Sequence, residues 1–280
     1  MKKVMFFIDT RNPPTQECLS KALLIANAFK LSIDLLIDSR NNHPERWYWP
    51  ELLSDQDKKV RQDGESDAIL TIEKALKETK LKYQKIILTK SSYATQINKL
   101  LEPETETLLI LEKKLRNKHH PIFQEIQKIN APILLTHDTQ WHSPINLAVA
   151  IDPLHEDVEE SLVNEHLVKL AAGLNKVTIS SWPLIHSIYV PPMAIEFKAQ
   201  IKTIHKETVM DFSSEHNIAK NRVVLISGNP EETIPQWAAN NQTDILVIGL
   251  LKRSKKPFRW IGSTASALIE NTSCDLLLAR

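Results

Sequence analysis

The sequence predicts an α/β protein made of two tandem open parallel sheets, each with five strands and with helices on both faces, in a Rossmann-like arrangement. Short, continuously apolar runs recur along the chain, separated by longer amphipathic stretches. Strands that are apolar throughout are typical of sheets covered on both faces, and strands that alternate with helices indicate parallel βαβ units. The same rhythm occurs twice, which predicts one unit copied in tandem.

The apolar runs place the expected strands. In the first half we expect strands at 3–9, 32–38, 85–89, 107–112 and 132–136. In the second half we expect them at 146–152, 176–181, 222–227, 244–249 and 274–279. Between the first two strands, the stretch 15–30 carries its apolar residues on one stripe of a helix.

The spacing of equivalent residues indicates the duplication. Asp9 and Asp152 each close a first strand, and they are separated by the same number of positions as Leu134 and Leu277 in the two last strands. The stretch 137–144 is polar and ends in proline, which is typical of a linker. We therefore expect one domain at 1–138 and a second at 144–280.

Composition excludes several classes of protein. The formal net charge of +1 over 280 residues gives no support for binding to nucleic acid or to an anionic membrane. No apolar stretch reaches the length of a membrane span, and the first apolar run stops at Asp9, too early for a signal peptide. The two cysteines, Cys18 and Cys274, favour a reducing compartment. These features predict a cytoplasmic location.

The stretch GLLKRSKKPFRWIGSTA, residues 249–265, is the strongest candidate for a site. Gly249 ends a predicted strand, and ligands of open parallel sheets bind at the carboxyl ends of the strands. Gly262 and Ser263 open a predicted helix, whose first-turn N–H groups favour phosphate, and Ser263 or Thr264 adds a hydroxyl. Positive charge is supplied by Lys252, Arg253, Lys255, Lys256 and Arg259. The alternative is a solvated basic loop that ends in a helix cap.

No catalytic or metal site is predicted. The dinucleotide fingerprint, the Walker loop, the Gly-x-Ser-x-Gly elbow and the His-Glu-x-x-His helix are all missing. The basic stretch KRSKK faintly resembles the phosphate-contacting lysine loop of class I aminoacyl-tRNA synthetases, but the His-x-Gly-His signature of those enzymes is absent. His119 and His120 have no evident third metal ligand, so we interpret them as part of a solvated loop.

An aromatic stretch, HPERWYWPELL at 43–53, raises a second hypothesis. Trp47 and Trp49 either form a lid over the domain's own core or belong to a surface for an apolar ligand or a protein partner. Trp182, Pro183, Met193 and Phe197 occupy the corresponding region of the second half.

The loop and its surroundings resemble the universal stress protein family. That family has a glycine at the end of its fourth strand, two further residues, a second glycine, nine residues, and then Gly-Ser or Gly-Thr at the last helix. Here Gly249 is followed by Leu250 and Leu251, Lys252, nine residues and Gly262-Ser263, so only the middle glycine differs. The aspartates in VAID and FFID, the turn VVLISGNPEETI and the ending GSTASALIENTSCDLLLAR agree as well.

The resemblance implies a non-catalytic stress-response protein whose two halves pack as a pseudo-dimer, and it leaves open the pairing of two chains as a homodimer. In its nucleotide-binding members the glycine loop holds the phosphates of ATP, and the first-strand aspartate lies near the adenosine. Carried over, the expected ATP site consists of Asp152, Gly249, Lys252, Gly262, Ser263 and Thr264. Lys252 either obstructs the turn or pairs with a phosphate. The first half lacks the loop. The alternative function is a nucleotide-free module that binds an apolar ligand or a protein partner.

Overall fold

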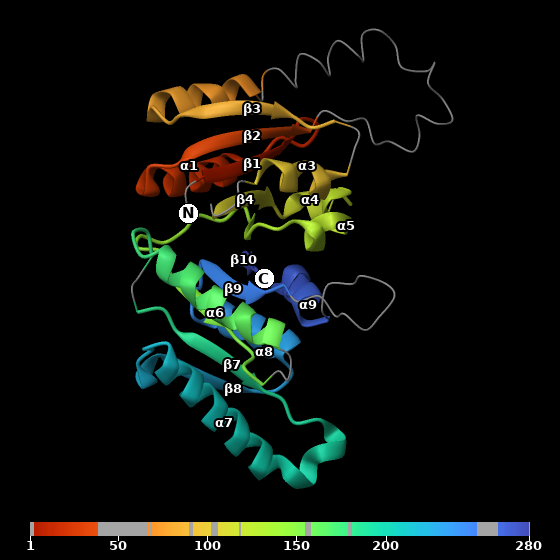
Figure 1. Ribbon diagram of the computed structural model, residues 1–280, viewed down its shortest axis with the longest axis vertical. Helices are drawn as coiled ribbons and strands as arrows, with labels where there is room; N and C mark the ends of the chain where they lie inside the picture. The colour runs from red at the N-terminus through yellow and green to blue at the C-terminus, as the bar shows by residue number, and fades with distance from the viewer. Residues whose placement is uncertain are drawn as a thin grey trace, which may run out of the picture. The chain divides into compact units, whose positions relative to one another are not determined.

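The computed structural model describes residues 3–38, 67, 69–89, 92–101, 106–117, 119–154, 158–178, 181–250 and 263–279. The chain divides into two compact units, Met1–Ala131 and Pro132–Arg280. Each unit is described by itself below. In Figure 1 the first unit runs from red to yellow-green and the second from green to blue.

The first unit is a parallel sheet with helices packed against it. Its strands are β1 (Lys3–Asp9), β2 (Ser32–Asp38), β3 (Tyr83–Ile87) and β4 (Thr107–Glu112). Its helices are α1 (Gln16–Phe29), α3 (Tyr93–Leu100), α4 (Lys114–Asn117), α5 (Ile122–Glu125) and the 3-10 turn η2 (Ile126–Lys128), and residues 69–79 are also helical. The described strands of this unit pair in the order β3-β2-β1-β4, all parallel.

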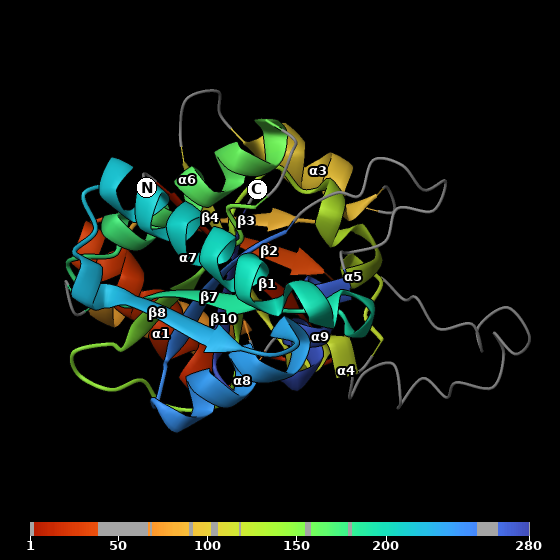
Figure 2. The ribbon, with the colours of Figure 1, turned by 90° about the horizontal axis from the view of Figure 1, so that it is seen from below.

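The second unit repeats this order. Its strands are β5 (Ile133–Thr136), β6 (Leu147–Ala150), β7 (Leu184–Ile188), β8 (Val223–Ser227), β9 (Ile245–Gly249) and β10 (Asp275–Ala279). Its helices are α6 (Val158–Gly173), η3 (Pro192–Phe197), α7 (Lys198–Glu215), η4 (Lys220–Arg222), α8 (Pro230–Asn240) and α9 (Ser263–Asn271). The order is β5-β10-β9-β6-β7-β8, and Figure 2 shows α7 and α8 on opposite faces of β7 and β8.

Apolar side chains of the central strands form the core of each unit. β1, β2 and β4 of the first unit are buried almost throughout, and so are β6, β9 and β10 of the second. Because both faces of these strands are covered, their sequences are continuously apolar, as the α/β prediction required.

The structure departs from the expected five parallel strands per half at one strand. β5, the last strand of the first sequence copy, belongs to the second unit and pairs antiparallel with β10, through Leu134 opposite Leu277. A continuously apolar strand gives no sign of its direction, so the sequence pattern could not reveal this pairing.

The strand expected at 176–181 is found only as a single parallel bridge between Thr178 and Ile145, and residues 179 and 180 lie outside the described residues. Val177 and Thr178 donate backbone hydrogen bonds to the carbonyl of Leu174 and continue the turn that ends α6. The second strand of this unit begins only at Leu184, after Pro183. Val177 and Thr178 are β-branched, which is typical of strands, but here the preceding helix determines their conformation.

The predicted linker is held in place within the second unit. Two buried aspartates, one just before β9 and one at the start of β10, accept its hydrogen bonds. Asp275 accepts from the His137 amide at 2.7 Å and from Trp141 Nε1 at 2.8 Å. Asp244 lies 2.8 Å from His142 Nδ1 and accepts from the Asn146 amide at 2.7 Å.

Candidate functional site

The candidate site lies where the strand order of the second unit reverses. β6 is followed in the chain by β7 on one side, whereas β9 lies on its other side, and all three are parallel. Asp152 follows the carboxyl end of β6, and Gly249 ends β9. Ligands of doubly wound sheets bind at this reversal point. The structure thus brings together two of the predicted site residues at adjacent strand ends.

The backbone of Asp152 is fixed while its side chain is exposed. Asn164 of α6 accepts a hydrogen bond from the Asp152 amide at 3.2 Å and donates one to the Asp152 carbonyl at 2.8 Å. Asn164 is itself buried, so both polar ends of its amide are used. This clamp holds a carboxylate at the carboxyl end of the first strand of the unit.

Gly249 has a packing reason to be glycine. A Cβ atom placed on it would lie 3.1 Å from Cγ1 of Val163 on α6, which is closer than ordinary van der Waals contact. The sequence analysis had assigned this glycine to a ligand site at the end of a strand. Among the described glycines only Gly228 has a φ in the left-handed half of the map. The close approach of α6 therefore accounts for Gly249 without a ligand.

The remaining predicted site residues lie at or before helix α9. α9 begins at Ser263, as expected, and Thr264 in its first turn is half-buried. The first N–H groups of a helix have no partner within the helix, so this end favours an anion. Lys252, Gly262 and the side chain of Ser263 lie outside the described residues, as do Trp47 and Trp49.

A histidine pair next to Asp152 was missed by the sequence interpretation. His186 of β7 is buried, and its Nε2 lies 2.7 Å from Nδ1 of His205 on α7. His186 Nδ1 lies 3.1 Å from the carbonyl oxygen of Ile151, the residue before Asp152. The available signal was a histidine inside the apolar run LIHSI. The second expected strand of this half was placed at 176–181, so His186 lay outside every expected strand.

The surroundings of His205 favour its neutral form. Burial lowers the pKa of His205, and the neighbouring His186 lowers this pKa further. Asp152 acts in the opposite direction, because a carboxylate stabilises an imidazolium. The pKa of His205 therefore lies below the ordinary value for histidine, and its state is coupled to the charge on Asp152.

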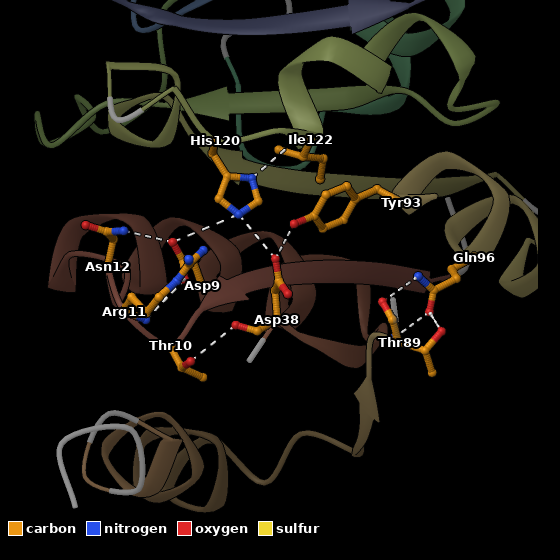
Figure 3. Close-up of polar contacts among 10 residues, drawn as sticks. All are labelled: Asp9, Thr10, Arg11, Asn12, Asp38, Thr89, Tyr93, Gln96, His120 and Ile122. Atoms are coloured by element: carbon orange, nitrogen blue, oxygen red, sulfur yellow. Dashed lines mark hydrogen bonds and ion pairs between the residues drawn. The ribbon is translucent and has the colours of Figure 1, made fainter. Parts of the chain in front are cut away.

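The equivalent place in the first unit is filled by its own side chains (Figure 3). Asp9 ends β1 and Asp38 ends β2, and the two residues are opposite one another in the sheet. Tyr93, the first residue of α3, donates a hydrogen bond to Asp38 Oδ2. His120 Nε2 lies 3.2 Å from the same oxygen and 4.0 Å from Asp9 Oδ2. Asp9, Asp38, Tyr93 and His120 are all buried.

Asp9 is held by residues that follow it directly. Arg11 donates its backbone amide and its Nε to Asp9 Oδ1, at 3.1 and 3.0 Å. Asn12 donates its side-chain amide to Asp9 Oδ2 at 2.8 Å. These bonds compensate the carboxylate charge in a place that water does not reach.

The burial of His120 corrects its interpretation as part of a solvated loop, whereas His119 is exposed as expected. His120 is 4% exposed, and its Nδ1 accepts a hydrogen bond from the Ile122 amide at 3.2 Å. That bond uses the Nδ1 lone pair, so the ring proton resides on Nε2, facing Asp38. A protonated Nε2 cannot bind a metal ion, which argues against a metal at this cluster.

The first unit also carries a carboxylate where the second has its strand-end glycine. Continuing the β1–β4 pairing by two residues places Glu112 opposite Ile8, as continuing the β6–β9 pairing places Gly249 opposite Ile151. Glu112 is buried, accepts from Thr15 Oγ1 at 2.7 Å and lies 3.0 Å from Lys114 Nζ. Three buried carboxylates, Asp9, Asp38 and Glu112, thus surround the reversal point of the first unit.

The fold and the site define a doubly wound α/β protein with ligand-accessible groups at the reversal point of its second sheet. Residues 147–280 match the sequence model of the universal stress protein family. The second half of the chain thus carries a universal stress protein domain at these residues. Among the described residues, no helix combines the length and the apolarity that crossing a bilayer needs.

The matches to curated relatives are longer than this domain. The universal stress protein E homolog of Haemophilus influenzae is 25% identical over 214 residues, which cover 70% of this chain and 69% of that protein. Universal stress protein E of Escherichia coli is 26% identical over 166 residues, which cover 55% of this chain and 52% of that protein. The matched part is thus about half of the Escherichia coli protein.

Solved structures show the same fold along the chain. A putative universal stress protein from Pseudomonas aeruginosa superposes with a TM-score of 0.72 at 18% identity, covering 100% of this chain and 93% of that one. A universal stress protein from Archaeoglobus fulgidus gives a TM-score of 0.59 at 12% identity, covering 99% and 96%. At these identities the likeness shows the fold alone.

Proposed function

We propose that the protein is a non-catalytic stress-response protein whose second unit binds ATP as a structural or regulatory ligand. The observation that carries this proposal is the exposed Asp152 carboxylate at the reversal point of the sheet in the second unit. A carboxylate accepts hydrogen bonds from the hydroxyls of a ribose, and the first turn of α9 favours the phosphates.

The proposed roles follow the chemistry of each residue. Asp152 contacts the adenosine, and Gly262, Ser263 and Thr264 present N–H and hydroxyl groups to the phosphates. Lys252 acts as a point charge on a phosphate. No described residue of this site is placed as a base for attack by water, which is why the proposal is a bound ligand and not hydrolysis.

The first unit is not proposed to bind nucleotide. Its reversal point holds three buried carboxylates, and an added phosphate would meet their negative charge where solvent does not screen it. The side chains of Tyr93 and His120 also occupy the region beside Asp38.

Calorimetric titration of the full chain with ATP tests the proposal. We expect one ATP per chain, and we expect Asp152→Ala to weaken binding by about ten- to a hundredfold, the value of a hydrogen bond to a charged group. Asp211→Ala, which changes an exposed aspartate on α7, is the matched control and should bind as the original does.

Mass spectrometry of small molecules released from protein purified without added ligand complements the titration. Release of an adenine nucleotide supports the proposal. If the original chain binds no ATP whereas Lys252→Gly does, the natural site has been lost and the proposal is wrong.

A second candidate function is a nucleotide-free module for an apolar ligand or a protein partner. Large apolar side chains on η3 favour it, since Met193 is 94% exposed and Ile195 and Phe197 are each 57% exposed. Exposed apolar residues that lie together are typical of interaction surfaces. Trp182, by contrast, is buried under Arg222 and does not join them. Met193→Ser with Phe197→Ser should leave ATP binding unchanged and abolish only partner binding.

A further inference from the structure

The histidine pair beside Asp152 has a defined direction of hydrogen bonding. The Ile151 carbonyl can only accept, so His186 must carry its proton on Nδ1 and donate it across 3.1 Å. The Nε2 atom of a neutral His186 is then an acceptor. His205 must therefore donate from its own Nδ1 across the 2.7 Å that separate the two rings. One nitrogen of the pair remains to take up a proton, His205 Nε2.

A second proton on the pair would be costly. The ring centroids are 5.0 Å apart, and two imidazolium ions at this separation repel one another. His186 is 2% exposed and is hydrogen-bonded at both of its nitrogens. Proton uptake by the pair therefore places its positive charge on His205, which is only half-buried.

Asp152 is the anionic group that acts on His205. Of the elements packed against α7, β7 presents His186, and the described strand β8 has no titratable side chain. η3 carries Glu196. η4 carries Lys220 and Arg222, and the Arg222 guanidinium lies over the Trp182 ring at 4.3 Å, with its Nε donating to the Trp182 carbonyl. The charge on His205 is thus coupled to the carboxylate of the proposed ligand site.

We propose that His205 is a proton-operated gate on the adenosine end of the Asp152 site. This rests on the proposed function. With the pair neutral, Asp152 accepts hydrogen bonds from the ribose hydroxyls. With a proton on His205 Nε2, the positive charge attracts the Asp152 carboxylate electrostatically and opposes its use by the ligand. Nucleotide affinity then falls as the solution is acidified.

The direction of the pH dependence of nucleotide affinity follows from the pKa of His205. Burial holds this pKa below the ordinary value of about 6.5, so the pair is neutral at pH 7 and above. Ligand that binds only the neutral form loses affinity once the pH falls below this pKa. For one proton, the loss approaches about tenfold per pH unit.

The test measures binding of ATP and of adenosine to the full chain between pH 8 and pH 5. Adenosine is included because it has no phosphate group that titrates in this range. His205→Asn keeps a side-chain amide that donates to His186 Nε2 but takes up no proton. His216→Asn is the matched control, because it removes a histidine at the far end of the same helix, where His216 stacks on Phe212.

We expect the original chain and His216→Asn to lose affinity for both ligands on acidification, and His205→Asn to bind equally well at pH 8 and pH 5.5. An unchanged pH slope in His205→Asn overturns the gate, and so does constant affinity in the original chain. Nitrogen NMR that finds the proton of His186 on Nε2 overturns it independently. If neither ligand binds any variant at any pH, the proposed function itself has failed and the gate falls with it.

Discussion

Asp9 ends β1 and Asp152 follows β6, the equivalent strand of the second unit, yet their surroundings are opposite. Asp9 is buried and is bonded to Arg11 and Asn12, whereas the side chain of Asp152 is exposed and its backbone is clamped by Asn164. The same contrast holds one strand away, where Glu112 of the first unit stands in the register position of Gly249. The difference shows that, at the point where the strand order reverses, charged side chains of the first unit pair with one another and fill the space that the second unit leaves accessible.

His120 takes part in this closure from a position before the last strand. It precedes β5 by the same number of residues as Gly262 precedes β10. In the first unit that position holds an imidazole that faces two carboxylates, and in the second it holds the smallest residue. The imidazole fills the space beside the carboxylates of the first unit, whereas Gly262 lies outside the described residues.

The largest expected effect is on the first aspartate. Asp9→Ala should lower the free energy of unfolding of the first unit by about 3–5 kcal/mol, because it leaves Arg11 without its buried partner. Asp152→Ala, at the equivalent exposed place, should change stability by less than about 0.5 kcal/mol. Hydrogen exchange of peptides from β1 and β6 reports on each unit. Equal effects of the two substitutions would break the comparison.

Tyr93 sharpens the comparison at the second strand. Tyr93→Phe removes the hydroxyl that donates to Asp38 and should cost the first unit about 1.5–3 kcal/mol, since a buried carboxylate loses a hydrogen bond. Tyr189→Phe changes a tyrosine that is 44% exposed and should be close to neutral. The measurement is again protection of β1 and β2 from exchange. Unchanged protection of β1 and β2 in Tyr93→Phe would mean that Asp38 does not depend on this hydrogen bond.

The smallest expected effect concerns the strand-end glycine. Gly249→Ala should destabilise the second unit by about 1 kcal/mol, because the added methyl crowds Val163. If packing against α6 is the reason, the cost should be smaller in a Val163→Ala background, as a double-mutant cycle followed by urea denaturation would show. A cost that does not depend on residue 163 would point to another role for the glycine.

Much of the fold could be predicted from the sequence, for identifiable reasons. Runs such as KVMFFID are apolar on both faces, and the turn after β8 needs the φ of 132° that Gly228 adopts. The failures also have physical causes. The β-branched residues at 177 and 178 are held in a turn by α6, and nothing in PILLT reports the direction of its partner strand.

The candidate site was predictable only in part. Asp152 and Gly249 stand at strand ends, which periodicity locates, and the structure brings them to adjacent strands. The partners of His186 and His120 come from α7 and from β2, far away in sequence. Such pairs depend on packing between elements, which the pattern along one chain does not contain.

The antiparallel pairing of β5 with β10 has a consequence for dissecting the chain. A fragment that begins after the linker would lack β5 and would leave the backbone donors and acceptors of β10 open along one side. Unpaired outer strands recruit other strands, often from a second molecule. A fragment that begins at residue 144 would therefore tend to self-associate through β10. A fragment that also retains residues 132–136 would keep β10 paired with β5.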